Sequence, residues 1–123
     1  MNKKAMIVEN APPAIGPYSH ANIIGDLVFV SGQLPLSDGV LVNEIPEATK
    51  ACLINLKNVL EGCGSSLDNC VKVTVFLRDM NDFAAMNAVY AEFFTANEPA
   101  RSCIAVAGLP KDARVEIEAF AHL

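Results

Sequence analysis

The sequence lacks the clusters of positive charge that are typical of nucleic-acid-binding proteins. Its nine Lys and Arg residues are scattered along 123 residues, and with 14 Asp and Glu residues they leave a formal net charge of −5. Binding to a phosphate backbone needs cationic groups gathered on one face. We therefore expect no nucleic-acid partner.

Motifs for metal binding are also missing. No CxxC or HExxH occurs, and the only two histidines, His20 and His122, lie far apart in the sequence. We expect no metal site and two ordinary, partnered histidines. The four cysteines are Cys52, Cys63, Cys70 and Cys103. They fall in apolar segments, which is typical of reduced, buried cysteines and favours a cytoplasmic protein.

Long apolar runs and cofactor loops are absent as well. No uninterrupted apolar run could span a membrane, and the apolar stretch after Lys4 is too short for a signal peptide. Neither GxxxxGK[ST], a strand-linked GxGxxG nor GxSxG occurs. We expect no membrane association and no cofactor, and no motif supports a Ser-His-Asp triad.

What the sequence does contain is an unusually apolar composition for a small protein. Hydrophobic residues make up 52% of the chain and the mean hydropathy is +0.32. The length indicates one domain, residues 1–123, with a sizeable core. The apolar balance indicates that other copies of the chain cover part of its surface.

Residue patterns predict the element order strand, strand, strand, helix, strand, helix, strand, strand. The expected ranges are 4–8, 18–24, 27–30, 47–63, 70–77, 79–94, 100–107 and 113–122. In the strand 70–77 the alternation predicts that Val71, Val73, Val75 and Leu77 share one face. The order indicates an α+β fold with both helices on one face of a mixed sheet.

The two last strands carry the charges that suggest chemistry. Alternation puts Arg101 and Cys103 on one face of the first, and Arg114, Glu116, Glu118, Phe120 and His122 on one face of the second. We expect the two strands to be neighbours, with Arg101 beside the glutamates on the sheet face away from the helices. An arginine binds a carboxylate bidentately, and a glutamate can deprotonate a water. The more frequent meaning of such a pattern is a solvated charged face.

Three other residues have two interpretations each. Gly32 allows a close approach of backbone or ligand, or marks a β-bulge. Asn87, a polar residue on an apolar helix stripe, ties down a loop or contacts a ligand. Cys103 is a nucleophile stabilised by Arg101 or, more often in such settings, a small apolar side chain.

Without a metal or cofactor, these groups suit an intrinsically easy reaction on a small carboxylate. Arg101, Glu116, Ser31 and Tyr18 are the available side chains. Hydrolysis of an imine qualifies, because its carbon is already electrophilic.

Six segments together resemble one known family, the RidA (YjgF-type) reactive-intermediate enamine/imine deaminases. They are Ile15-Gly16-Pro17-Tyr18-Ser19-His20-Ala21, Val30-Ser31-Gly32-Gln33, Val73-Thr74-Val75-Phe76-Leu77, residues 87–94, Pro99-Ala100-Arg101-Ser102-Cys103 and residues 109–119. Each is a weak signal, but their order and spacing are specific, and the resemblance covers essentially the whole chain.

The resemblance implies a chorismate-mutase-like α+β fold of about six strands and two helices, assembled as a homotrimer with clefts between subunits. It implies cofactor-independent hydrolysis of 2-aminoacrylate and 2-aminocrotonate, or their imines, to 2-oxo acids and ammonia. Pyridoxal-phosphate-dependent dehydratases would supply these substrates. Arg101 matches the carboxylate-binding arginine and Glu116 the glutamate that positions water. Tyr18, Ser31, Gly32, Cys103 and Asn87 match pocket positions, and the short loop 95–98 bears on substrate range.

Other members of the family are described as endoribonucleases that inhibit translation, or as small-carboxylate-binding regulatory proteins. The acidic charge argues against the first alternative. A purely binding protein would keep Arg101 without needing Glu116.

Overall fold

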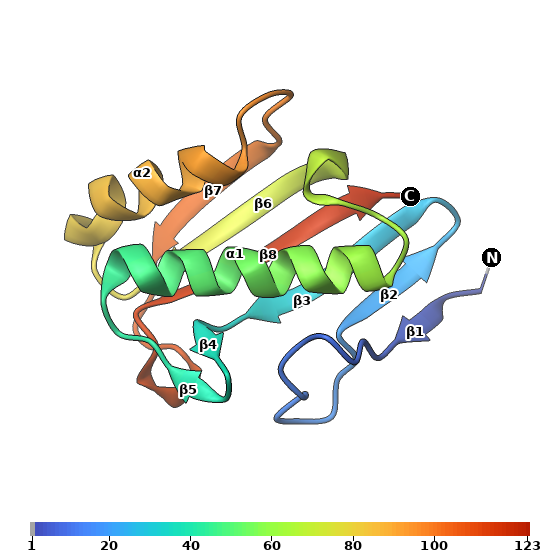
Figure 1. The fold of residues 1–123 in the computed structure, drawn as a ribbon, viewed down its shortest axis with the longest axis horizontal. Coiled ribbons are helices and arrows are strands. Elements are labelled where there is room, and N and C mark those ends of the chain that lie inside the picture. Colours follow the sequence, from blue (N-terminus) through green and yellow to red (C-terminus); the bar gives the residue numbers. More distant parts are fainter. Residues whose placement is uncertain (1) are drawn as a thin grey trace.

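The computed structural model of the chain describes residues 2–123. A six-stranded sheet forms one layer, and both helices lie against one of its faces (Figure 1). The strands, in sheet order, are β1 (Lys4–Met6), β2 (Ala21–Ile24), β3 (Leu27–Gln33), β8 (Val115–His122), β6 (Cys70–Leu77) and β7 (Ala100–Ala105). A separate hairpin pairs β4 (Leu36–Ser37) with β5 (Val40–Leu41). The predicted α+β class is confirmed.

The sheet is mixed because one of its strand pairs is parallel. β6 and β7 run parallel, whereas every other neighbouring pair of the sheet is antiparallel. Parallel neighbours need a crossover, and α2 (Phe83–Phe93) supplies it. This crossover puts α2 above β7 at the edge of the sheet (Figure 1).

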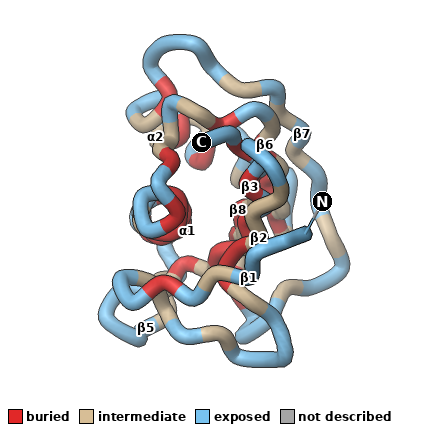
Figure 2. The backbone as a smooth tube through the Cα atoms, turned by 90° about the vertical axis from the view of Figure 1, so that its right-hand side faces the viewer, coloured by how far each residue is buried: buried red, intermediate tan, exposed pale blue. Residues whose placement is uncertain are grey.

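The helix α1 (Ile45–Gly62) covers the middle of the sheet. Its apolar stripe is fully buried, and Figure 2 shows the buried residues gathered between helix and sheet. Pro46 stands in the first turn, where its missing N–H costs nothing. At the other end Gly64 has a φ of 85° and donates to the Glu61 carbonyl, and Ser65 N donates to Leu60 O at 2.8 Å. These two bonds form a Schellman motif that ends the helix.

The second helical region is built in two segments. The sequence predicts one helix beginning at Asp79, but a short 3₁₀ segment, Met80–Asp82, precedes α2. Asp79 does act as the predicted cap, because its carboxylate accepts from Asn81 N at 2.9 Å.

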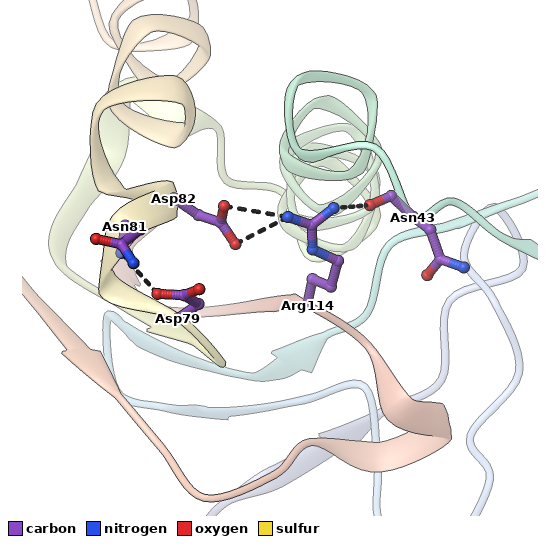
Figure 3. A network of polar contacts seen from close by, with 5 residues as sticks. All are labelled: Asn43, Asp79, Asn81, Asp82 and Arg114. Carbon is purple, nitrogen blue, oxygen red and sulfur yellow. Dashed lines mark hydrogen bonds and ion pairs between the residues drawn. The ribbon is translucent and has the colours of Figure 1, made fainter.

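Arg114 joins the starts of the two helices instead of facing the glutamates as predicted. Its Nη2 lies 3.1 Å from both carboxylate oxygens of Asp82, and its Nη1 donates to the Asn43 carbonyl at 2.9 Å (Figure 3). Arg114 immediately precedes β8, and from this end of the sheet its long side chain reaches Asp82 and the Asn43 carbonyl.

The sheet face without helices carries exposed apolar side chains. Val71 is 52% exposed and does not share a face with Val73, contrary to the prediction, because the register shifts between Cys70 and Lys72. The Phe29 and Phe120 rings contact each other at 5.0 Å on this face, and both are more than a third exposed. We call this surface, with Val71, Phe29, Phe120 and Ile104, the open face.

Candidate active site

A pocket of about 380 Å³ gathers four of the predicted site residues on the open face. Tyr18, Ser31, Gly32 and Glu116 line it, together with Ile15, Leu34, Pro110 and Glu118. Two strands place these groups: β3 carries Ser31 and Gly32, and β8 carries the glutamates. The Tyr18 hydroxyl accepts from Ile15 N at 3.2 Å, so the loop before β2 closes one side.

Gly32 lies directly against the Glu116 carboxylate. A Cβ added to Gly32 would stand 2.8 Å from Glu116 Cδ and would overlap the carboxylate oxygen. The residue also sits in the irregular register between Val30 and Gln33. The irregular register agrees with the bulge interpretation of Gly32. The close approach that the structure shows is that of the Glu116 side chain, and the approach of a ligand stays a prediction.

The surroundings of the Glu116 carboxyl favour its protonated form more than water does. Burial raises the pKa of Glu116 above its ordinary value, and the Glu118 carboxylate beside it raises that pKa further. A carboxylate with a raised pKa is a better proton acceptor than an exposed glutamate.

Ser31 is fixed in place by its neighbours. Its hydroxyl donates to the Ser19 carbonyl at 2.6 Å, and its N–H donates to the His20 carbonyl at 3.0 Å. His20 is itself buried, with Nδ1 accepting from Val8 N and Nε2 donating to the Pro12 carbonyl, each at 2.8 Å. The expectation of an ordinary partnered histidine is confirmed for His20, which supports the wall of the pocket.

Arg101 lies elsewhere, on the helix-covered side of the sheet. Its Nη1 donates to Asn87 Oδ1 at 2.6 Å, and its guanidinium carbon lies 4.7 Å from the centre of the Tyr90 ring and 5.5 Å from that of Phe83. These three partners all belong to α2. We call Asn87, Tyr90 and Phe83 the arginine cradle.

The expectation that Arg101 stands beside Glu116 on one sheet face is wrong within a single chain. β6 lies between β7 and β8, so the two charged strands are not neighbours. Arg101 pairs in register with Val73, whose side chain is buried under the helices. Glu116 pairs with Phe76, three residues further along β6, so its side chain lies on the opposite face of the sheet. Alternation within each strand was read correctly, but it cannot fix the face of one strand relative to another.

Cys103 and Asn87 lie on the same side of the sheet as Arg101, away from Glu116. Cys103 pairs with Val75 on the same side as Arg101 and is partly buried against the core. Burial raises the pKa of the Cys103 thiol more than Arg101 lowers it, which disfavours a thiolate nucleophile. Asn87 contacts Arg101, and within residues 2–123 its side chain makes no hydrogen bond to a loop.

The sequence interpretation missed Tyr90 and Phe83 as partners of Arg101, and Asn55 as a support of the pocket. Phe83, Asn87 and Tyr90 recur at helical spacing, which was the available signal. Asn55 is buried on α1 and donates to the Leu34 and Leu36 carbonyls at 3.1 and 2.9 Å. Its position on a buried helix face was the signal there.

All four cysteines are free, as expected. Within residues 2–123, no three His, Cys, Asp or Glu side chains are grouped so that they could hold a metal ion. In that same range, neither helix is both long and apolar enough to cross a membrane. A larger hollow of about 510 Å³ lies beside α1 and the β4–β5 hairpin; Ile15 lines both it and the Glu116 pocket, but neither Glu116 nor Arg101 lines it.

Comparison with known proteins identifies relatives over nearly the whole chain. The sequence model described as Endoribonuclease L-PSP matches residues 8–123. The 2-iminobutanoate/2-iminopropanoate deaminase of Salmonella typhimurium is 45% identical over 123 residues, covering 96% of each chain. The YjgF gene product of Escherichia coli superposes with a TM-score of 0.92 at 42% identity, covering 97% of this chain and 98% of its own. TdcF of the same organism, solved with bound serine, gives a TM-score of 0.90 at 42% identity, covering 96% and 98%.

The matched range, residues 8–123, includes all six segments that carry the resemblance, and the TM-scores show that the solved relatives share the fold. The chain belongs to the RidA family, also called the YjgF or Endoribonuclease L-PSP family.

Proposed function

We propose that the protein is a 2-iminobutanoate/2-iminopropanoate deaminase that works in clefts between the subunits of a homotrimer. The observation that carries the proposal is the division of its functional groups. Glu116 lines a pocket on the open face with Tyr18, Ser31 and Gly32, and Arg101 lies on the opposite side. A site that needs both groups is incomplete in one chain and requires Arg101 from a neighbouring copy.

The surface composition supports such an assembly. Leu27, Phe29, Val71, Ile104 and Phe120 are all between 37% and 52% exposed. Apolar patches of this kind are typical of surfaces that another subunit covers. A cytoplasmic location is part of the proposal, and the four free cysteines are consistent with it.

The proposed mechanism uses only groups of the chain. Arg101 binds the substrate carboxylate through two parallel N–H···O bonds and so fixes the imine carbon. Glu116 accepts a proton from a water as its oxygen bonds to that carbon. The same proton then passes to the nitrogen to give a carbinolamine. Glu116 next accepts the hydroxyl proton of the carbinolamine and transfers it to the amine as the C–N bond breaks, so that ammonia leaves and a 2-oxo acid remains. Relatives support the substrate class: the Salmonella protein is named for these imines, and TdcF binds serine, a small amino carboxylate.

The test compares the parent protein with Arg101→Lys and Glu116→Gln. A pyridoxal-phosphate-dependent threonine dehydratase generates the imine, and 2-oxobutanoate release, 2-oxobutanoate binding and melting temperature are measured on all three proteins. We expect Arg101→Lys to lose about tenfold or more in kcat/KM, because lysine keeps the charge but not the bidentate fork. We expect Glu116→Gln to bind 2-oxobutanoate but to lose about a hundredfold or more in kcat, since an amide cannot accept the proton.

The same experiment separates catalysis from a merely structural role. If Arg101 and Glu116 only stabilised the sheet, each change would lower melting temperature and activity together. A Glu116→Gln protein that hydrolyses the imine at the parent rate overturns the mechanism. RNA degradation is assayed in parallel and none is expected, because a net charge of −5 disfavours phosphate contacts.

A further inference from the structure

The surroundings of Arg101 differ from those of the other arginines of the chain. Arg78 is paired with the Asp112 carboxylate, and Arg114 with the Asp82 carboxylate at 3.1 Å. Within residues 2–123, Arg101 has no carboxylate within 4.0 Å, and its one side-chain hydrogen bond goes to the neutral amide oxygen of Asn87. Of the three arginines, it alone keeps its positive charge unpaired.

The arginine cradle holds the guanidinium without neutralising it. Tyr90 and Phe83 present aromatic faces, which attract a cation through their quadrupoles but carry no net charge. Tyr90 is only 7% exposed and packs on Phe94, with ring centres 4.6 Å apart, so its position is fixed by the core. Burial raises the pKa of Tyr90 to about 12, which keeps the ring neutral beside the cation.

The cradle also leaves most of the donors of Arg101 unused. A guanidinium has five N–H groups, and Asn87 accepts from Nη1 alone. The Tyr90 hydroxyl is buried without a hydrogen-bond partner, so the tyrosine contributes its ring and not its oxygen. The contacts therefore orient the guanidinium while its remaining edge stays available for a planar anion.

We propose that Asn87, Tyr90 and Phe83 are positioning residues that hold Arg101 for the substrate carboxylate and keep its charge uncompensated. Asn87 then acts through Arg101 and does not touch the substrate. This inference rests on the proposed function for the identity of the carboxylate. It adds a specific requirement, namely that the acceptor at position 87 be neutral.

The decisive variant is Asn87→Asp, which has nearly the same shape but places a carboxylate against the guanidinium. The new ion pair competes with the substrate, so we expect KM to rise, and 2-oxobutanoate binding to weaken, by about tenfold or more while kcat changes less. The melting temperature should stay the same or rise. Asn58→Asp on α1 adds the same charge away from Arg101 and serves as the control. Unchanged binding by Asn87→Asp overturns the inference.

The role of the rings is tested at position 90. Tyr90→Leu removes the π-face, and we expect about a threefold to tenfold loss of 2-oxobutanoate affinity. Tyr90→Phe keeps the face and removes only the unpartnered hydroxyl, so it should recover most of that affinity. Since Tyr90→Leu also disturbs the core, Phe83→Leu at a 36% exposed position provides a second variant with an intact core. If both leucine variants bind like the parent, the cradle is not a positioning device.

Failure of this inference and failure of the proposed function are distinguishable. If the parent protein binds 2-oxobutanoate, and Asn87→Asp weakens this binding, but the parent does not hydrolyse the imine, the inference about the arginine cradle stands and the proposed deaminase activity is wrong. If the parent protein hydrolyses the imine and the Asn87→Asp variant has the same KM, the proposed deaminase activity stands and the inference about the arginine cradle is wrong.

Discussion

At the residue scale, Gly32 lies so close to the Glu116 carboxylate that no side chain fits at position 32 while the carboxylate stays in place. A methyl group at position 32 would occupy the space of the Glu116 carboxylate. The carboxylate is the far end of a flexible side chain, so it can rotate away at little cost to the fold. In the proposed mechanism, catalysis depends on where that carboxylate points, whereas we expect little effect on stability.

We therefore predict that Gly32→Ala reduces kcat/KM by about tenfold to a hundredfold, because a displaced general base loses its alignment with the water. The free energy of unfolding, measured in urea, should fall by less than about 1.5 kcal/mol. Gly108→Ala is the matched control, since a Cβ there meets nothing within 4 Å. A fully active Gly32→Ala protein would contradict the assignment of Glu116 as the base.

In the proposed mechanism, the pair of carboxylates on β8 sets the pH dependence of activity. Burial raises the pKa of Glu116 and the Glu118 carboxylate raises it further. The base must be ionised, so activity should fall on acidification at a higher pH than for an ordinary glutamate. Glu118→Gln removes the like charge and lowers the pKa of Glu116. We predict that the acid limb of the kcat/KM profile moves to lower pH, and an unmoved limb would contradict the coupling.

The same raised pKa fixes the sign of the stability effect. A glutamate whose pKa is higher in the folded state favours folding when protonated, and this contribution is lost as the pH rises through the raised value. Glu116→Gln should thus melt at a higher temperature than the parent at neutral pH, with the difference fading in acid. A lower melting temperature at neutral pH would indicate a structural role instead.

At the element scale, the C-terminal turn of α1 packs closely on the N-terminal segment. A Cβ at Gly62 would stand 2.5 and 2.9 Å from the two methyl groups of Val8, which is itself only 7% exposed. This close approach explains why a glycine occupies the last helical position. A positive φ is not the reason, because Gly62 does not have one. The positive φ belongs to Gly64 in the Schellman motif.

We predict that Gly62→Ala destabilises the fold by about 1–3 kcal/mol through overpacking, although glycine to alanine in a helix usually stabilises by about 0.5–1 kcal/mol. Urea unfolding measures the change. In Gly62→Ala combined with Val8→Ala, the loss should be smaller than the sum of the two single losses, because the clash is removed. An increase in stability for Gly62→Ala alone would show that Val8 can move aside freely.

The helices and strands were largely predictable from the sequence. Which face of the sheet each strand residue occupies was predictable only in part. Apolar periodicity gave α1 within two residues of its start and the strand β6 with its observed bounds, Cys70–Leu77. Local patterns could not show the register shift after Cys70 that turns Val71 outward, nor that β6 separates β7 from β8. Strand order depends on contacts distant in sequence, and for this reason the face of Arg101 was assigned wrongly while its partner Asn87 was singled out correctly.

At the scale of the whole molecule, the two halves of the proposed site point in opposite directions. Arg101, on the edge strand β7, lies with its cradle against α2. The Glu116 pocket lies on the open face. A cyclic arrangement in which the β7 edge of one copy meets the open face of the next would join them and cover the exposed aromatic side chains. Each cleft would then draw Arg101 and Glu116 from different chains.

This division predicts that two inactive variants restore each other. Arg101→Ala and Glu116→Gln are mixed in equal amounts, unfolded together and refolded, so that chains assemble at random. About one cleft in four then receives an intact arginine from one chain and an intact glutamate from the other, so activity should return to about a quarter of the parent value. The same proteins mixed without unfolding should remain inactive if subunits exchange slowly. If the co-refolded mixture stays as inactive as its components while light scattering shows a normal assembly, Arg101 and Glu116 do not meet between chains. A stable monomer in light scattering would contradict the trimer itself.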